Sequence, residues 1–195
     1  MNENGQPVFY YDLASPYAYL AAERITEVLP VTPVWQPILL GGIWRQSGGG
    51  SWAMTDAREE GMAEIERRAE RYGLLPVRWP DPWPGNSLKA MRAATFAQQI
   101  GRAVAFSLAA FRQAFAAGRD LSELDNVVIA AAACELHPKA LLKAIETQSV
   151  KDRLRDATAE AYALGVRGVP SVAVGGQVFF GDDRLEEAAA ALGQD

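Results

Sequence analysis

The sequence predicts an α/β protein in which a long helical segment interrupts a small sheet-forming unit. Two observations carry this prediction. Residues 1–40 show strand, helix and strand patterns in that order, and residues 148–195 show a helix, two short strands and a helix. Residues 41–147, between them, show mostly helical periodicity. Strands separated by helices in this way are typical of a sheet covered by helices.

The first sheet-forming unit is predicted from a short apolar run at residues 8–12, a helix at 15–28 and a second strand at 30–38. Ser15 and Pro16 open the helix, because serine caps a helix N-terminus and proline is favoured in the first turn. A helix between two strands predicts a parallel pair with a right-handed crossover. The prolines of the second strand favour a place at the sheet edge.

The middle of the chain is predicted to be a glycine-rich loop followed by helices. Residues 41–51 are rich in glycine and are predicted as the loop. The proline- and tryptophan-rich segment 79–85 is incompatible with a regular helix. Helices are predicted on either side of it, at residues 62–72, from 86 or 87 onward, 103–117, 122–134 and 138–147.

The last part of the chain is predicted to hold a helix at 150–164, strands at 171–174 and 177–180, and a final helix at 183–192. The pair Gly175-Gly176 between the strands indicates a tight hairpin. Without the helical block the element order is βαβ followed by αββα, which is the thioredoxin arrangement. The sequence therefore predicts a thioredoxin-like fold with a large all-helical insertion. Residues 1–40 and 148–195 would form the thioredoxin-like domain, and 41–147 the inserted helical domain.

Composition limits the classes of function. The chain has 195 residues, 49% of them hydrophobic, and a formal net charge of −5. Nucleic-acid-binding proteins usually present a basic face, so this charge argues against nucleic acid as a partner. The sequence contains no apolar run long enough to cross a bilayer. Residues 1–6 are polar and lack the apolar core of a signal peptide. We therefore expect a cytoplasmic protein without membrane partners.

The single cysteine and the single histidine exclude two kinds of chemistry. Cys134 has no partner cysteine, so the chain forms no internal disulfide and contains no C-x-x-C motif. This excludes a disulfide oxidoreductase, and the apolar run around Cys134 predicts a buried residue. His137 precedes Pro138 at a predicted helix start, where a structural role is expected. Without a second histidine or cysteine, we predict no metal site.

Ser15 and Val169-Pro170 are candidate site residues. A residue at a helix start after a strand, with a distant Val-Pro before another strand, outlines a thioredoxin-type site. Ser15 either only caps its helix or also donates a hydrogen bond to a bound thiolate, which the helix N-terminus stabilises. Charge-assisted hydrogen bonds supply roughly 1.5–3 kcal/mol, and one pKa unit requires about 1.4 kcal/mol. Pro170 either begins the strand or is cis and turns the backbone of Val169 toward a peptide-like ligand.

Asp182 and Asp183 are the third candidate feature. Asp183 and Glu186 fit a capping box for the last helix. Alternatively, the two aspartates hold an ammonium group such as that of a γ-glutamyl moiety, or one of them caps while the other binds. Gly48-Gly49-Gly50 lacks the Lys-Ser/Thr of a phosphate-binding loop and is either a cover or a surface loop. Four tryptophans are expected in the core or between the domains, and one or two of them as walls of an aromatic substrate pocket, namely Trp35, Trp44, Trp79 and Trp83.

Motifs along nearly the whole chain resemble one family. They lie at residues 15–17, 19–21, 40–43, 84–87, 165–171 and 180–185. With these motifs in this order, the chain resembles the 2-hydroxychromene-2-carboxylate isomerases and kappa-class glutathione transferases, relatives of the DsbA-type oxidoreductases. Kappa-class enzymes carry an asparagine soon after the Gly-Gly-Ile segment, and this chain has Gly48-Gly49-Gly50 there instead.

The resemblance implies glutathione as the cofactor and assigns a role to each candidate residue. Ser15 would contact the glutathione sulfur, and Val169 before a cis-Pro170 would pair through its backbone with the cysteinyl part. Asp182 and Asp183 would bind the γ-glutamyl end. In the isomerases the thiolate is thought to add to a conjugated aromatic keto acid, to allow bond rotation and then to leave.

Three functions remain open at this point. The first is a glutathione-dependent cis–trans isomerase acting on a small aromatic acid. The second is a glutathione transferase or peroxidase that uses the same site. The third is a non-catalytic thioredoxin-fold module that binds peptides or a partner protein. A homodimer formed through the helical block is also compatible with the sequence.

Overall fold

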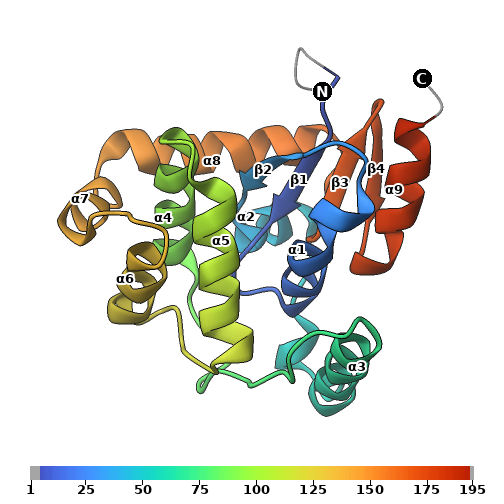
Figure 1. The fold of residues 1–195 in the computed structure, drawn as a ribbon, viewed down its shortest axis with the longest axis horizontal. Coiled ribbons are helices and arrows are strands. Elements are labelled where there is room, and N and C mark those ends of the chain that lie inside the picture. Colours follow the sequence, from blue (N-terminus) through green and yellow to red (C-terminus); the bar gives the residue numbers. More distant parts are fainter. Residues whose placement is uncertain (1–4, 194–195) are drawn as a thin grey trace.

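A computed structural model describes residues 5–193, and within them the strands form a four-stranded sheet of order β2-β1-β3-β4 (Figure 1). The strands are β1 (Val8–Tyr11), β2 (Val34–Pro37), β3 (Ser171–Val174) and β4 (Gln177–Phe180). Residues 1–4 and 194–195 lie outside the described residues, so most of the polar N-terminal segment is not among them.

The strand pairing follows the predicted order. β1 runs parallel to β2, with Val8 opposite Val34, and antiparallel to β3. β3 and β4 form an antiparallel hairpin. Gly175 and Gly176 connect them with φ values of 53° and 84°, which glycine adopts without a steric cost. The predicted hairpin and the bounds of both its strands are confirmed.

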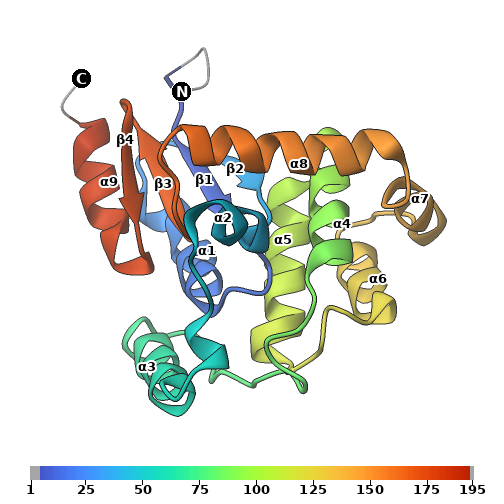
Figure 2. The ribbon, with the colours of Figure 1, turned by 180° about the vertical axis from the view of Figure 1, so that it is seen from behind.

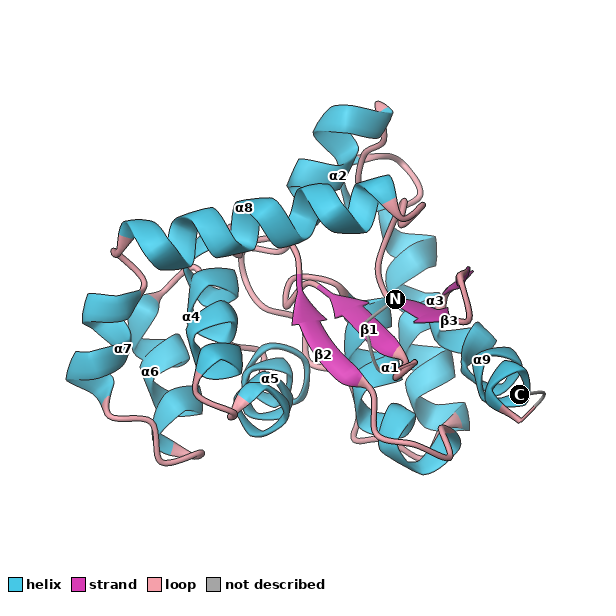
Figure 3. Cartoon of the chain, turned by 90° about the horizontal axis from the view of Figure 1, so that it is seen from above, coloured by secondary structure: helices cyan, strands magenta, loops and turns pink. Residues whose placement is uncertain are grey.

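The two faces of the sheet belong to different hydrophobic clusters, because successive side chains of a strand point to opposite sides. Phe9 and Tyr11 belong to the cluster that contains α1 (Pro16–Val28) and α9 (Leu185–Leu192). Val8 and Tyr10 belong to the cluster that contains residues of α2 (Leu40–Ser47) and α8 (Gln148–Ala163). Figure 3 shows α8 running along one side of the sheet, with α1 and α9 on the other.

The inserted segment is mostly helical, as predicted. Its further helices are α3 (Arg58–Arg71), α4 (Leu88–Gln99), α5 (Ala103–Phe111), α6 (Leu124–Ala132) and α7 (Pro138–Ala144). A π-helical turn at Arg112–Ala116 completes the helix predicted to reach residue 117. The cluster on the α1 face continues from the sheet into α4, α5 and α6. The division into two domains at residues 40 and 148 stays a prediction.

The prediction of a loop at residues 41–51 was wrong for its first part. Leu40–Ser47 form α2, and Gly48, with a φ of 75°, ends it. Glycine weakens an isolated helix, but here it lets α2 lie close against α8. A Cβ at Gly42 would lie 2.9 Å from Cγ2 of Thr158. Tertiary packing therefore compensates for the low helix propensity of this segment.

The edge of the sheet at β2 is covered by α4. Gln98 donates a hydrogen bond from Nε2 to the carbonyl oxygen of Trp35 (2.9 Å) and another to Oε1 of Gln36 (3.0 Å). The prolines of this segment predicted an edge strand, and β2 does lie at the edge. Within residues 5–193, no helix has both the length and the apolar character needed to cross a bilayer.

Candidate functional site

Ser15 is the N-cap residue of α1 and also contacts the segment before β3. Its Oγ accepts a hydrogen bond from the backbone N–H of Ala18 (3.2 Å) and donates to the carbonyl oxygen of Val169 (3.5 Å). Only 6% of Ser15 is exposed. The predicted cap is confirmed, with Pro16 at the first helical position. The structure also brings together Ser15 and Val169, which the sequence analysis expected to meet.

Val169 retains an unused backbone donor. The Val169–Pro170 peptide bond is cis, and the carbonyl oxygen of Pro170 accepts a hydrogen bond from the N–H of Gly181 (3.0 Å). Within the described residues, the N–H of Val169 makes no backbone hydrogen bond. Val169 is buried and lines the same cavity as Ser15. A peptide-like ligand can therefore hydrogen-bond to this backbone as an added strand does.

A cavity of about 600 Å³ opens beside Ser15. This volume lies within the usual range for small-molecule sites. Its apolar walls come from α2, from the turn at Trp52–Met54, from the loop before α4 and from β4, which gather around the start of α1 (Figure 2). The large apolar residues of these walls are Trp44, Trp52, Met54, Trp83 and Phe180.

The four tryptophans considered above lie in different surroundings. Trp35 is in the core, whereas Trp44 and Trp83 line the cavity. Trp79 packs on Trp83 with ring centroids 4.5 Å apart. Trp52 was not predicted as a cavity residue, because it lies in a short 3₁₀ turn without a periodic pattern.

Helix N-termini give the cavity a positive character. α1, α2 and α4 all begin at its surface, where Tyr17, Gly41 and Leu88 contribute to the lining. The free N–H groups and the dipole at a helix start favour an anion. Arg45 and Arg167 also line the cavity, and among the described lining residues Asp12 is the acidic one. The cavity is therefore suited to an anionic ligand or to a thiolate.

Asp12 holds the segments around the cavity together, a role that the sequence analysis missed. Its Oδ1 accepts from the N–H of Ala14 (3.0 Å), and its Oδ2 accepts from the N–H of Leu40 (2.9 Å). Burial raises the pKa of the Asp12 carboxyl, while hydrogen bonds from Ala14, Leu40 and the Ser87 side chain lower it. The carboxylate thus links the loop before Ser15 to the starts of α2 and α4. The sequence feature that could have indicated this role is the position of Asp12, an acidic residue directly after a buried strand.

Asp182 and Asp183 have different surroundings. The Asp182 side chain is 1% exposed, and its oxygens accept from Nη1 of Arg68 (2.8 Å) and from the hydroxyl of Tyr72 (2.9 Å). The Asp183 side chain is 57% exposed, with Oδ2 3.6 Å from Nη1 of Arg68. Burial raises the pKa of Asp182, and Arg68 and Tyr72 oppose this effect. Neither aspartate lines the cavity beside Ser15. Asp182 joins α3 to the segment before α9, and Asp183 keeps an accessible carboxylate.

The predicted capping box at Asp183 and Glu186 was wrong. Residues Asp182–Arg184 form a 3₁₀ turn, and Arg184 is the N-cap residue of α9 without a side-chain hydrogen bond. Glu186 instead forms an ion pair with Arg24 of α1. The residues that resemble a capping box are used for tertiary contacts with α1 and α3.

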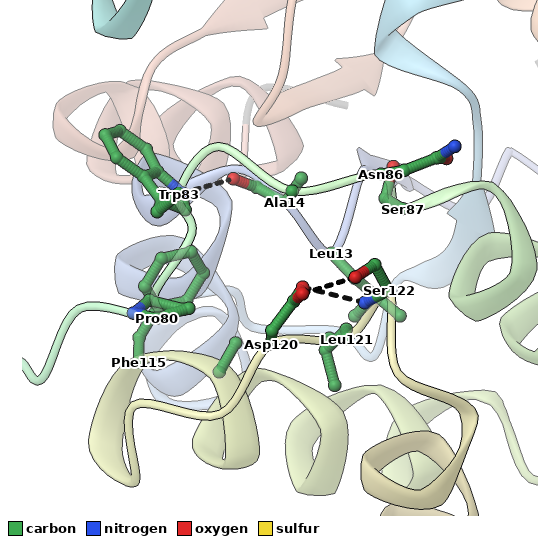
Figure 4. A pocket seen from close by; sticks show the side chains of 12 residues that line it. Leu13, Ala14, Pro80, Trp83, Asn86, Ser87, Phe115, Asp120, Leu121 and Ser122 are labelled. Carbon is green, nitrogen blue, oxygen red and sulfur yellow. Dashed lines mark hydrogen bonds between the residues drawn. The ribbon is translucent and has the colours of Figure 1, made fainter.

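A smaller cavity of about 20 Å³ lies behind the loop before α4 (Figure 4). This volume is close to that of one water molecule. Trp83 donates from its indole N–H to the carbonyl oxygen of Ala14 (3.4 Å), the residue before Ser15. A Cβ at Gly85 would lie 2.6 Å from Oδ1 of Asp120, so glycine permits the close approach of this loop. The loop is therefore fastened to the backbone beside Ser15.

Cys134 and His137 have structural roles, as predicted. Cys134 is buried, and its thiol donates to the carbonyl oxygens of Ala130 (3.4 Å) and Ala131 (3.2 Å). His137 caps α7, with Nδ1 accepting from the N–H of Lys139 (3.2 Å). Neither residue lines the cavity beside Ser15.

The fold and the site define a class of protein. A helix N-terminus after β1, a cis-proline before the β3–β4 hairpin and helices inserted between them are the features of a thioredoxin-fold protein with a helical insertion. The DSBA-like thioredoxin domain family matches residues 8–193. The chain belongs to this family.

Similar proteins include two kinds of enzyme. The chain is 27% identical over 188 residues to a 2-hydroxychromene-2-carboxylate isomerase of Sphingobium xenophagum, covering 91% of this chain and 93% of that protein. It is also 27% identical to glutathione S-transferase kappa 1 of Rattus norvegicus, over 95% of this chain and 89% of that protein. A solved 2-hydroxychromene-2-carboxylate isomerase has the same fold, with a TM-score of 0.87 at 22% identity, covering 96% of this chain and 94% of that one. Because these relatives are enzymes, they support the conclusion that this protein is an enzyme as well.

Proposed function

We propose that the protein is a glutathione-dependent isomerase that acts on a small aromatic, ring-opened keto acid. The observation that carries this proposal is that the Ser15 hydroxyl and the unused N–H of Val169 belong to residues lining one aromatic-walled cavity. The similarity to 2-hydroxychromene-2-carboxylate isomerase supports the reaction type. The similarity to glutathione S-transferase kappa 1 supports glutathione as the cofactor.

The residues present offer a partner for each end of glutathione. The backbone of Val169 would pair with the cysteinyl part, next to the cis-Pro170 bond. Ser15 would hydrogen-bond to the sulfur, and Asp183 would bind the ammonium of the γ-glutamyl end. Asp182 would act indirectly, because Arg68 and Tyr72 already occupy its oxygens.

When bound, glutathione would supply a thiolate able to add reversibly to the conjugated double bond of the substrate, whose electron pair would move to the conjugated carbonyl oxygen and return when the thiolate leaves. Ser15 would stabilise this thiolate by turning its one hydroxyl proton from the carbonyl oxygen of Val169 (3.5 Å) to the sulfur. A charge-assisted hydrogen bond of roughly 1.5–3 kcal/mol is enough to lower a thiol pKa by one or two units. The start of α1 adds its dipole. Trp44, Trp52 and Trp83 shield the reacting bond from water and hold the aromatic ring.

The second candidate is a glutathione transferase of the kappa type, and the extent of the match to glutathione S-transferase kappa 1 favours it. The same Ser15 geometry activates a thiolate for either reaction. The two functions differ in whether the sulfur stays on the product. Kappa-class enzymes carry an asparagine soon after the Gly-Gly-Ile segment, whereas in this chain Gly48 ends α2 and Gly50 lines the cavity, so an asparagine contact would be missing here.

The experiment is a calorimetric titration with glutathione, followed by an assay with 2-hydroxychromene-2-carboxylate. Isomerisation that requires added glutathione, and that leaves its amount unchanged, supports the isomerase. Consumption of glutathione with an electrophilic aromatic halide, without isomerisation, supports the transferase. If millimolar glutathione produces no saturable binding, both proposals are wrong and a non-catalytic binding module becomes the better interpretation.

A further inference from the structure

A second pocket, of about 250 Å³, lies between α2, α4 and α8 on the side of α2 away from Ser15. Its apolar lining consists of Leu39, Gly42, Leu88, Leu154 and Ala159. Its charged lining is entirely basic among the described residues, and consists of Arg45, Arg92, Lys151 and Arg155. A protein with a net charge of −5 thus gathers four cations around one apolar hollow.

Two of these cations have no close partner in the described part of the protein. The Arg92 side chain is only 18% exposed, and the nearest carboxylate oxygen, on Glu146, is 4.0 Å away. Arg45 has no carboxylate within that distance among residues 5–193. Lys151, in contrast, lies 3.1 Å from Glu146, and Arg155 pairs with two aspartates of its own helix.

The state of Arg92 points to a ligand. A guanidinium group carries five N–H donors in a fixed plane, and a largely buried one is usually paired. Within the described chain, the Arg92 side chain has only the distant contact with Glu146. Partial removal from water without a matching acceptor is costly. An oxyanion in this pocket would supply the missing acceptors.

We propose that this pocket binds a small organic carboxylate with an apolar body, such as an aromatic or short aliphatic acid. A carboxylate accepts two parallel hydrogen bonds from a guanidinium, which explains the basic rim. The leucines and Ala159 would contact the apolar body. The volume lies just below the usual range of about 300–1,000 Å³ for ligand pockets, which limits the ligand to a small acid.

The pocket is a site separate from the cavity beside Ser15. The two share Leu39, Arg45 and Leu88 as a common wall. Arg92 and Lys151 line only the second pocket, whereas Ser15 lines only the first. The proposal therefore does not depend on the reaction performed at Ser15.

The test is a calorimetric titration of the full chain with benzoate at low ionic strength. Arg92→Gln is expected to weaken benzoate binding at least tenfold. Arg71→Gln is the matched control, because it removes the same charge from an exposed arginine of α3 that lines neither pocket, and it should leave the affinity within twofold. Added salt should weaken binding to the wild type, as expected for an ionic contact.

A second variant tests whether weaker benzoate binding comes from the pocket itself and not from a change in charge or folding. Ala159→Phe places a ring at the pocket without changing any charge, and it should also weaken benzoate binding at least tenfold. Both variants should keep the wild-type affinity for glutathione. Glutathione binding tests the proposed function at Ser15 and benzoate binding tests the second pocket, so the two proposals can fail independently. The proposal is overturned if the wild type shows no saturable binding, or if Arg92→Gln or Ala159→Phe binds benzoate as tightly as Arg71→Gln does.

Discussion

The hydroxyl oxygen of Ser15 lies 3.5 Å from the carbonyl oxygen of Val169, although 154 positions separate the two residues in the sequence. This contact joins the start of α1 to the segment before β3. It also places the hydroxyl next to a backbone whose N–H has no acceptor among the described residues. The site is therefore assembled only when both ends of the chain have folded together.

Ser15→Ala should reduce turnover much more than stability. The substitution removes an N-cap hydrogen bond, which typically costs about 1 kcal/mol, and it also removes the proposed donor to the thiolate. We expect turnover to fall at least tenfold in the isomerisation assay. Thr147→Ala is the control, because Thr147 caps α8 in the same way but does not line the cavity. Equal losses of turnover in the two variants would contradict a specific role for Ser15.

Asp183→Ala and Asp182→Asn should separate binding from stability. Asp183 is exposed, so its replacement should change the unfolding free energy by less than about 0.5 kcal/mol while weakening glutathione binding about tenfold or more. Asp182→Asn leaves Arg68 without its buried partner and should cost about 3 kcal/mol. Urea unfolding and calorimetry measure the two effects. If Asp183→Ala destabilises the protein and retains full affinity for glutathione, Asp183 has a structural role and does not bind the ligand.

The free energy of unfolding should fall in alkaline solution as the Tyr72 hydroxyl loses its proton. Burial, the Asp182 charge and the hydrogen bond to Asp182 raise its pKa to about 12, from an ordinary value of 10.0. The folded state therefore favours the protonated phenol. This contribution to stability is complete below pH 10 and is lost as the pH rises to about 12. The difference in unfolding free energy between the wild type and Tyr72→Phe should shrink across this interval.

A second variant checks the cause of the Tyr72 shift. Asp182→Asn removes the charge that opposes the phenolate, so the pKa of Tyr72 should fall toward 10. Absorbance titration near the tyrosinate band, with Tyr72→Phe subtracted, follows this group alone. An unchanged pKa in Asp182→Asn would show that burial accounts for the shift.

Gly168→Ala should alter substrate binding through Phe180. A Cβ at Gly168 would lie 2.6 Å from Cε2 of Phe180, so the ring must move. Phe180 is 58% exposed, and the move should cost less than about 1 kcal/mol of stability. We expect KM for the aromatic acid to rise several-fold with kcat little changed. Gly41→Ala is the control, because it adds a methyl to the same cavity with nothing within 4 Å. An unchanged KM in Gly168→Ala would argue against contact between Phe180 and the substrate.

Local sequence patterns predicted most of the fold. The cap at Ser15, the Gly175-Gly176 hairpin and the helices around the breaks depend on short-range chemistry, and they were confirmed. Residues 41–47 were misassigned as a loop, because the helix there depends on packing of Gly42 against Thr158. Glutathione, the homodimer and the cytoplasmic location stay predictions.

The site was harder to predict wherever its residues act through distant partners. The contacts of Asp182 with Arg68 and Tyr72 cross more than a hundred positions, so the sequence did not indicate that this carboxylate is already occupied. Asp12 bonds backbone groups of another helix, and no side-chain motif marks such a contact. The proximity of Ser15 and Val169 could be predicted because each lies next to a recognisable element, while their roles toward a ligand stay predictions.

The central position of β1 has a consequence for protein synthesis. β2 follows β1 closely in the sequence, so the two can pair early in synthesis, but the other edge of β1 pairs with β3, where Val8 lies opposite Ala173. At the usual rates of translation, roughly ten to thirty seconds separate the two strands. Throughout that interval the nascent chain presents an unpaired, apolar strand edge, which is prone to wrong pairing. A chain stalled before residue 171 would keep that edge open, and its best protection would come from a chaperone that covers extended backbone.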